Sequence, residues 1–295
     1  MRNSRNELAK GMADLATESI LFEVILTPKP GLVDAKDAGS HKDMDIFTFV
    51  RSAVSISHGF QEFFYAGYDH MDSPDELFSK IRPLGMEVEE KMYGATNSVN
   101  THKGIIFSMG IVLAAVGHYE KDRTLQGEYT TRDTDEIFDL VRVMTQGLVM
   151  KDFMDLMDRS PRTHGERLYI QHGFTGIRGE AEAGYPILKE KALPLLREMK
   201  DTNLTLEEKL LETLVLLMAY AEDTNVVTRG GIDALYHVQE TAKAFLTSGG
   251  VRQAHYREIL EEMNLDFKEK NLSPGGAADL LSLAIFFGKL EGLLK

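Results

Sequence analysis

The sequence predicts an all-α fold, a single globular domain over residues 1–295 with roughly ten or more helices of typical length. Apolar residues recur with the spacing of amphipathic helices along most of the chain. No segment shows a convincing run of the two-residue alternation that is typical of strands. No fixed-period repeat is present, and no linker rich in glycine, proline or serine divides the chain. These observations favour one helical domain.

The composition indicates an ordinary globular protein without a nucleic-acid or membrane partner. The net charge of −13 argues against nucleic acid, because phosphate backbones favour basic surfaces. The apolar run at residues 105–116 is shorter than the roughly 20 residues that cross a bilayer. The N-terminus leads into an amphipathic pattern rather than a signal sequence, and there is no cysteine for disulfides or thiolate metal sites. We therefore expect a cytoplasmic protein.

Five helices are expected in the first half of the chain. The first covers residues 6–26 and is stopped by two prolines, Pro28 and Pro30. The third begins at Ser73-Pro74, where Ser73 and Glu76 form a capping-box pattern, and Pro83 is expected to kink or split it. The fourth contains residues 105–116 and is apolar on all sides, so other helices should surround it. The second and fifth cover residues 45–65 and 135–150, with a surface loop at residues 121–132.

The second half is expected to hold shorter helices separated by glycine-containing loops. A short helix at residues 166–170 is followed by a loop with three glycines, and Glu180 opens the next helix, which prolines interrupt. Thr205 and Glu208 form a second capping-box pattern, which starts a helix that ends at residues 222–223. Further helices are expected at residues 233–247, at residues 251–263 and from Ser273 to the C-terminus.

Five polar segments that contain glycine lie at these helix boundaries: residues 29–34, 100–104, 173–180, 223–231 and 273–279. Helix capping explains any one of them, since glycine, proline, serine, asparagine and aspartate are ordinary turn residues. Capping does not require Lys103, Arg178 and Arg229 in the same turns. Helix starts offer free N–H groups and the positive end of the helix dipole, which bind anions such as phosphate. We therefore predict a nucleotide site built from helix-boundary loops.

The charged residues of these segments suggest how an acidic protein binds a nucleotide. Lys29 and the three cations named above would contact phosphates. Four carboxylates could hold Mg²⁺ on a polyphosphate, or one of them could act as a general base: Asp34, Glu180, Asp223 and Asp279. The sequence contains no P-loop, dinucleotide-binding, zinc-protease or nucleophile-elbow motif.

The five segments together strongly resemble the triphosphoribosyl-dephospho-CoA synthase family, in order, over residues 10–290. The stretches that carry the resemblance are Thr27-Pro-Lys-Pro-Gly-Leu-Val-Asp34, Val99-Asn-Thr-His-Lys-Gly-Ile-Ile-Phe107, Thr175-Gly-Ile-Arg-Gly-Glu-Ala-Glu182, Asp223-Thr-Asn225 with Arg229-Gly-Gly231, and Asn271-Leu-Ser-Pro-Gly-Gly-Ala-Ala-Asp279. One departure is Ser98, where the family pattern leads us to expect glycine.

The resemblance implies the reaction and its partners. ATP and 3′-dephospho-CoA would give 2′-(5″-triphosphoribosyl)-3′-dephospho-CoA with release of adenine. This product is the precursor of the prosthetic group of the citrate lyase acyl carrier protein, and a related branch serves malonate decarboxylase. Mg²⁺ is inferred as the cofactor that accompanies ATP.

The resemblance also gives the site residues roles. Asp34, Glu180 and Asp223 are the expected catalytic carboxylates, and Asp34, Asp223 and Asp279 the expected magnesium ligands. The expected substrate-binding residues are Lys29, Gly31, Asn100, Thr101, His102, Lys103, Gly104, Arg178, Gly179, Asn225, Arg229, Gly230, Gly231, Ser273, Gly275 and Gly276.

Two other functions are left open by the sequence. A Mg²⁺-dependent ADP-ribosyl hydrolase is also all-helical and also acts at a ribose anomeric carbon, with water as acceptor. A helical scaffold without activity would leave the five segments without purpose. Dependence of adenine release on dephospho-CoA distinguishes the transferase from the hydrolase. A nucleotide-induced rise in melting temperature distinguishes an enzyme from the scaffold.

Overall fold

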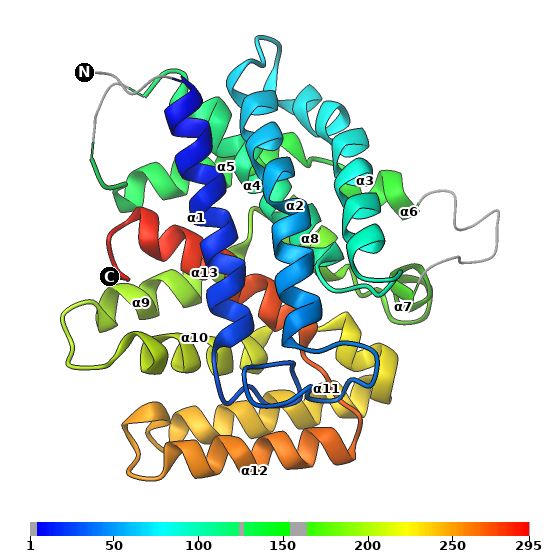
Figure 1. Ribbon diagram of the computed structural model, residues 1–295, viewed down its shortest axis with the longest axis vertical. Helices are drawn as coiled ribbons and strands as arrows, with labels where there is room; N and C mark the ends of the chain where they lie inside the picture. The colour runs from blue at the N-terminus through cyan, green and yellow to red at the C-terminus, as the bar shows by residue number, and fades with distance from the viewer. Residues whose placement is uncertain (1–4, 124–126, 154–163, 295) are drawn as a thin grey trace.

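The computed structural model describes residues 5–123, 127–153 and 164–294, and it is all-α as predicted (Figure 1). No strand occurs in these residues. Short turns of other helix types lie at Pro74–Glu76, Leu188–Ala192 and Gly250–Arg252. The α-helices are α1 (Arg5–Ile25), α2 (Ile46–Tyr68), α3 (Leu77–Ala95), α4 (Lys103–Glu120), α5 (Thr131–Met144), α6 (Leu148–Phe153), α7 (His164–His172), α8 (Gly176–Glu182), α9 (Leu193–Met199), α10 (Leu206–Tyr220), α11 (Thr224–Thr247), α12 (Tyr256–Glu269) and α13 (Gly275–Leu290).

Helices α4 and α13 form the centre of the molecule. Nearly every residue of α4 from Ile105 to Gly117 is buried, which confirms that the apolar run is surrounded by other helices. Helix α4 packs against α2, α3, α5 and α13, and α1 covers both α2 and α13 (Figure 1). None of the helices in the part of the chain that the structure describes is long and apolar enough to span a membrane.

Two glycines allow α2 and α4 to approach closely. A Cβ atom on Gly67 would lie 1.8 Å from the carbonyl oxygen of Ala114, and one on Gly117 would lie 2.2 Å from that of Phe64. Such distances are far inside van der Waals contact, so any side chain at either position would force the two helices apart. Because the start of α4 lies at the site described below, this packing also fixes the position of that start.

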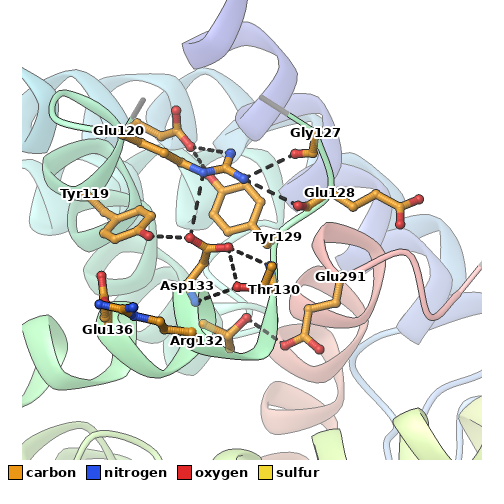
Figure 2. Close-up of polar contacts among 12 residues, drawn as sticks. Tyr119, Glu120, Gly127, Glu128, Tyr129, Thr130, Arg132, Asp133, Glu136 and Glu291 are labelled. Atoms are coloured by element: carbon orange, nitrogen blue, oxygen red, sulfur yellow. Dashed lines mark hydrogen bonds and ion pairs between the residues drawn. The ribbon is translucent and has the colours of Figure 1, made fainter. Parts of the chain in front are cut away.

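The C-terminal end of α4 is held by a polar network (Figure 2). Tyr119 donates a hydrogen bond to Asp133, and Tyr129 donates one to Glu120. Asp133 also completes a capping box with Thr130 at the start of α5. The Tyr129 backbone N–H bonds to the carbonyl of Leu290 at 2.9 Å, which joins the network to the end of α13. Both central helices are therefore anchored at the end far from their N-termini.

Several helices begin or end at residues other than those predicted. The Ser73 side chain makes no capping bond, and a short 3₁₀ turn leads into α3, which continues through Pro83 without interruption. Helix α5 begins at Thr131 and ends at Met144, before Gly147, which has a positive φ. By contrast, the Thr205 capping box forms as predicted.

Three further boundaries differ near the polar segments. Glu180 lies inside α8 rather than at the start of a helix, so the expected glycine loop is partly helical. Helix α11 begins at Thr224 and is broken in its backbone angles only at Gly231, whereas we expected a loop up to that residue. The N-cap of α13 is Pro274 rather than Ser273, and α12 begins at Tyr256, later than predicted.

Candidate active site

All five polar segments meet at one pocket of about 250 Å³. It lies where α4, α11 and α13 begin, and α1, α2, α8 and the loop between α1 and α2 complete its walls. The predicted residues that line it are Lys29, Asn100, Thr101, His102, Lys103, Gly104, Glu180, Asp223, Asn225, Arg229, Ser273, Gly275, Gly276 and Asp279. The chain therefore brings together residues that are up to 250 positions apart in sequence (29 to 279).

Two predicted residues of the first segment shape its loop instead of lining the pocket. Asp34 is buried, and its carboxylate accepts hydrogen bonds from the backbone N–H groups of Lys29, Lys36 and Asp37. Gly31 has a φ of +73°, and a Cβ there would lie 2.4 Å from the carbonyl oxygen of Leu272. Both residues fold the loop that carries Lys29, and the structure does not place Asp34 as a catalytic base or a metal ligand.

Four more predicted residues lie outside the pocket lining. Arg178 points to α6, where its Nε donates to Asp152 at 2.8 Å. Gly179 leaves room for the Thr175 side chain, whose Oγ1 would lie 1.9 Å from a Cβ. Gly230 packs against the side chains of Ala234 and Leu272, and Gly231 forms the break in α11. These four residues therefore shape the helices that form the pocket walls and do not line the pocket themselves.

Asp223 caps two helices with one carboxylate. Its Oδ1 accepts from the N–H groups of Asn225 and Val226 at the start of α11, and its Oδ2 accepts from the N–H of Ala277 at 3.0 Å, in the first turn of α13. Burial raises the pKa of Asp223, whereas these N–H groups lower it. A carboxylate fixed at two helix N-termini suits a structural cap and not a proton acceptor. It also occupies the N–H group of Gly276, which we had expected to bind phosphate.

The start of α4 presents a cation beside a carboxylate. The Lys103 side chain is half exposed and pairs with Glu89 of α3 at 2.8 Å, and its N–H donates to Asn100 Oδ1 at 3.3 Å. A Cβ on Gly104 would lie 2.0 Å from Oδ2 of Asp279. Only glycine therefore lets the Asp279 carboxylate reach this helix start. Burial raises the pKa of that carboxyl, which has no hydrogen-bond partner within the described residues.

A buried ion pair that the sequence did not suggest lies at another wall. Lys29 is 1% exposed and pairs with Glu23 of α1, while its Nζ also donates to the Glu23 carbonyl at 2.6 Å. Burial raises the pKa of Glu23, and the Lys29 charge lowers it. The helical pattern around Glu23 gave no signal. The available hint was Lys29, because a lysine ammonium that becomes buried needs an acidic or polar partner close by.

His41 is a second residue that the sequence did not single out. Its Nε2 hydrogen-bonds with the Ser273 hydroxyl at 2.9 Å. Arg229 lies against the same ring and donates to the Ser40 carbonyl at 3.0 Å and to the Asn271 side chain at 3.1 Å. These bonds hold the loop after α1 against the segment before α13, so Arg229 both lines the pocket and closes it.

Glu180, like Asp279, is a pocket carboxylate with an oxygen that has no partner among the described residues. Its Oε2 is buried and has no hydrogen-bond partner among the described residues. Burial raises the pKa of Glu180 to about 7, and the charges of Glu222 and Glu190 add to the effect. A carboxyl group that titrates near neutral pH can accept or donate a proton during turnover.

The three carboxylates predicted as magnesium ligands do not meet as a preformed cluster. Among the residues that the structure describes, no group of three or more histidine, aspartate or glutamate side chains is arranged to hold a metal. Asp34 and Asp223 are occupied by backbone N–H groups, whereas Asp279 faces the pocket without such bonds. Mg²⁺ on a nucleotide is usually held by only one or two carboxylates and the phosphates, so Asp279 alone fits that pattern.

The turn before α4 explains why the family pattern leads us to expect glycine at position 98, where this chain has serine. Ser98 has a φ of +67°, a conformation that glycine adopts most readily. The preceding residue, Asn97, also has a positive φ of 54°. The serine therefore keeps the backbone conformation of the turn at some cost in strain.

Comparison with known proteins agrees with the geometry. A family model for ATP:dephospho-CoA triphosphoribosyl transferase (CitG) matches residues 9–295. A probable 2-(5′′-triphosphoribosyl)-3′-dephosphocoenzyme-A synthase of Photobacterium profundum is 40% identical over 287 residues, which cover 97% of this chain and 89% of that protein. A protein of the same description from Streptococcus mutans is 39% identical over 298 residues, covering 98% of this chain and 99% of the relative. No solved structure matches the chain significantly. The chain therefore belongs to the ATP:dephospho-CoA triphosphoribosyl transferase family.

Proposed function

We propose that this chain transfers the 5-triphosphoribosyl group of ATP to the 2′-hydroxyl of 3′-dephospho-CoA in the pocket at the start of α4, with release of adenine. One observation supports this pocket as the place of the reaction. Every one of the five segments that resemble the family contributes residues to this pocket. The product is the precursor of the prosthetic group of citrate lyase, whose acyl carrier protein would receive it.

The chemistry requires that the triphosphate stays intact. The 2′-oxygen of dephospho-CoA bonds to C1′ of the ATP ribose, and the bond from C1′ to adenine breaks with its electrons going to the base. An oxocarbenium-like transition state is expected at such a sugar centre. The triphosphate is therefore bound and oriented without activation. Lys103, the N-terminus of α4 and Arg229 are suited to that task.

Glu180 is the residue we assign as the general base. Among the pocket carboxylates, Asp223 is held by backbone N–H groups and Glu23 by Lys29. Glu180 has an oxygen without a partner among the described residues and a pKa of about 7, so it is ready to take a proton at neutral pH. It accepts the proton of the attacking hydroxyl, and the departing adenine takes up one proton, which balances the reaction.

Asp279 is the residue we assign to Mg²⁺. It faces the pocket beside Gly104 and has no other bonding partner among the described residues, as a ligand for a nucleotide-bound cation requires. Bound Mg²⁺ would neutralise part of the triphosphate charge. Chelation of divalent cations is expected to abolish turnover, and added Mg²⁺ to restore it.

The test is incubation with ATP and 3′-dephospho-CoA, followed by mass spectrometry for adenine and the triphosphoribosyl product. Both are expected in equal amounts, and adenine release should require dephospho-CoA. Adenine and free triphosphoribose formed from ATP alone would instead indicate a hydrolase. Release of inorganic phosphate or pyrophosphate as the main product would contradict the proposal.

A further inference from the structure

His102 lines the pocket with one ring nitrogen bonded to the protein and the other unused. Its Nδ1 lies 2.6 Å from the Ser52 hydroxyl, and its Nε2 is buried without a hydrogen-bond partner among the described residues. The residue is 4% exposed, and its ring makes an edge contact with Phe49 at 5.0 Å. A buried polar atom without a partner is costly unless a ligand or water completes it.

The hydroxyl of Ser52 is placed to select which ring nitrogen of His102 carries the proton. Ser52 is fully buried in α2 and lies between two partners from the start of α4. The Thr101 hydroxyl lies 2.7 Å from the Ser52 hydroxyl, and when Thr101 is the donor of this bond the single proton of Ser52 is directed to Nδ1 of His102. The imidazole then carries its own proton on Nε2.

The ring stays uncharged at every working pH. Burial, with a smaller contribution from the Lys29 ammonium, lowers the pKa of His102 to about 3. An N–H donor that stays neutral binds an oxygen anion without itself becoming a general acid. It also adds a donor in a pocket where Lys29 and Lys103 are already paired with glutamates.

We propose that Ser52 is a positioning residue, which fixes His102 as the tautomer that presents an Nε2–H donor to a phosphate oxygen of the nucleotide. The proposal rests on the proposed function in one respect, namely that a triphosphate occupies this pocket. The tautomer itself does not depend on any ligand. Ser52 does not line the pocket, so it acts on a bound ligand through His102.

The first test measures the tautomer in the ligand-free protein. Long-range ¹H–¹⁵N correlation spectra of ¹⁵N-labelled protein distinguish protonated from unprotonated ring nitrogens, and His102→Gln identifies the His102 signals by their loss. We expect a protonated Nε2 and an unprotonated Nδ1 between about pH 5 and about pH 8. In Ser52→Ala the Nδ1-protonated form should become populated. A protonated Nδ1 in the unsubstituted protein would overturn the proposal, whatever the enzyme's activity.

The second test measures ATP binding by calorimetry in a double-mutant cycle. Losing the Nε2–H donor to a charged phosphate oxygen in part of the molecules should raise the Kd for ATP about tenfold in Ser52→Ala, which corresponds to about 1.4 kcal/mol. Because the contact is to a group that does not react, KM should rise similarly while kcat changes little. His102→Gln keeps a donor near Nε2, and on that background Ser52→Ala should have no further effect.

The matched control is Ser57→Ala, which removes a hydroxyl of the same helix whose one hydrogen bond within the described residues is to the Val54 carbonyl. It should change neither the tautomer nor the Kd. An equal loss of ATP affinity from Ser52→Ala with and without His102→Gln would show a general structural role and overturn the proposal. Failure of the transferase assay with the expected tautomer and Kd changes would count against the proposed function alone.

Discussion

Glu180 should make the protein less stable as the pH rises through neutrality. In the folded protein, burial raises the pKa of Glu180 from 4.5 to about 7. The folded protein therefore holds a proton that the unfolded chain releases near pH 4.5. The stability that the protonated carboxyl contributes is present at low pH and is lost progressively up to about pH 7. One pKa unit corresponds to about 1.4 kcal/mol, so the loss between about pH 5 and about pH 8 is roughly 2–3 kcal/mol.

The assay is urea unfolding of the unsubstituted protein and of Glu180→Gln at both pH values. Glutamine resembles the protonated carboxyl and can still accept the backbone hydrogen bond from Ile187, so the variant should lack this part of the pH dependence. The difference between the two proteins removes the contributions of all other titrating groups. The control is Glu262→Gln, an exposed residue of α12, which should leave the pH dependence unchanged.

Activity gives an independent measure of the same group. If Glu180 is the base, turnover should rise with pH to a plateau above about 7, and Glu180→Gln should reduce kcat about 10²–10⁴-fold and remove that rise. An equal pH dependence of stability in the variant and the unsubstituted protein would refute the reasoning about burial. Normal turnover in the variant would refute the catalytic assignment while leaving the burial argument intact.

Four other changes test the site and the packing that positions it. Lys103→Ala should raise the Kd for ATP at least about tenfold, measured by calorimetry, with an unchanged urea midpoint, because Lys103 is half exposed and contributes little to stability. Asp223→Ala removes the shared cap of two helices and should lower the free energy of unfolding by about 2–4 kcal/mol. Gly67→Ala should cost about 1–3 kcal/mol by separating α2 from α4, whereas Gly94→Ala, where a Cβ meets open space, should stabilise α3 by about 0.5–1 kcal/mol. Asp279→Asn should raise the Mg²⁺ concentration for half-maximal activity about tenfold or more.

These outcomes can each contradict the assignment behind them. An ATP affinity that survives loss of the Lys103 ammonium would place the triphosphate elsewhere. An unfolding free energy that is unchanged without the Asp223 carboxylate would mean that the two helix starts are satisfied by water. Equal effects of alanine at Gly67 and Gly94 would show that helix contact is not what Gly67 provides. An unchanged Mg²⁺ requirement without the Asp279 carboxylate would remove that residue from the metal site.

The five segments could be found from the sequence because local signals mark them approximately as helix boundaries, and their convergence was expected from the resemblance to the family. Glycine, proline and capping residues indicate where helices end, and the apolar run indicates which helix is central. The chemistry of single residues was less predictable. Asp34 and Asp223 have the side chain of a catalytic base, and only the structure shows that backbone N–H groups hold both of them. Glu23 lies on an ordinary amphipathic helix, and its partnership with Lys29 depends on how that helix meets the following loop.

The charges of the pocket explain why an enzyme with net charge −13 needs more than side-chain cations to bind ATP. Among the cations that line the pocket, Lys29 is neutralised by Glu23 and Lys103 by Glu89, whereas Arg229 bonds to carbonyl oxygens. Glu180 and Asp279 bring further negative charge as they ionise. A triphosphate must therefore displace Glu89 from Lys103, arrive with a divalent cation, and use neutral donors such as helix N–H groups and the His102 ring. Neutral donors of this kind bind the polyphosphate while adding no charge that would assist cleavage of its phosphoanhydride bonds.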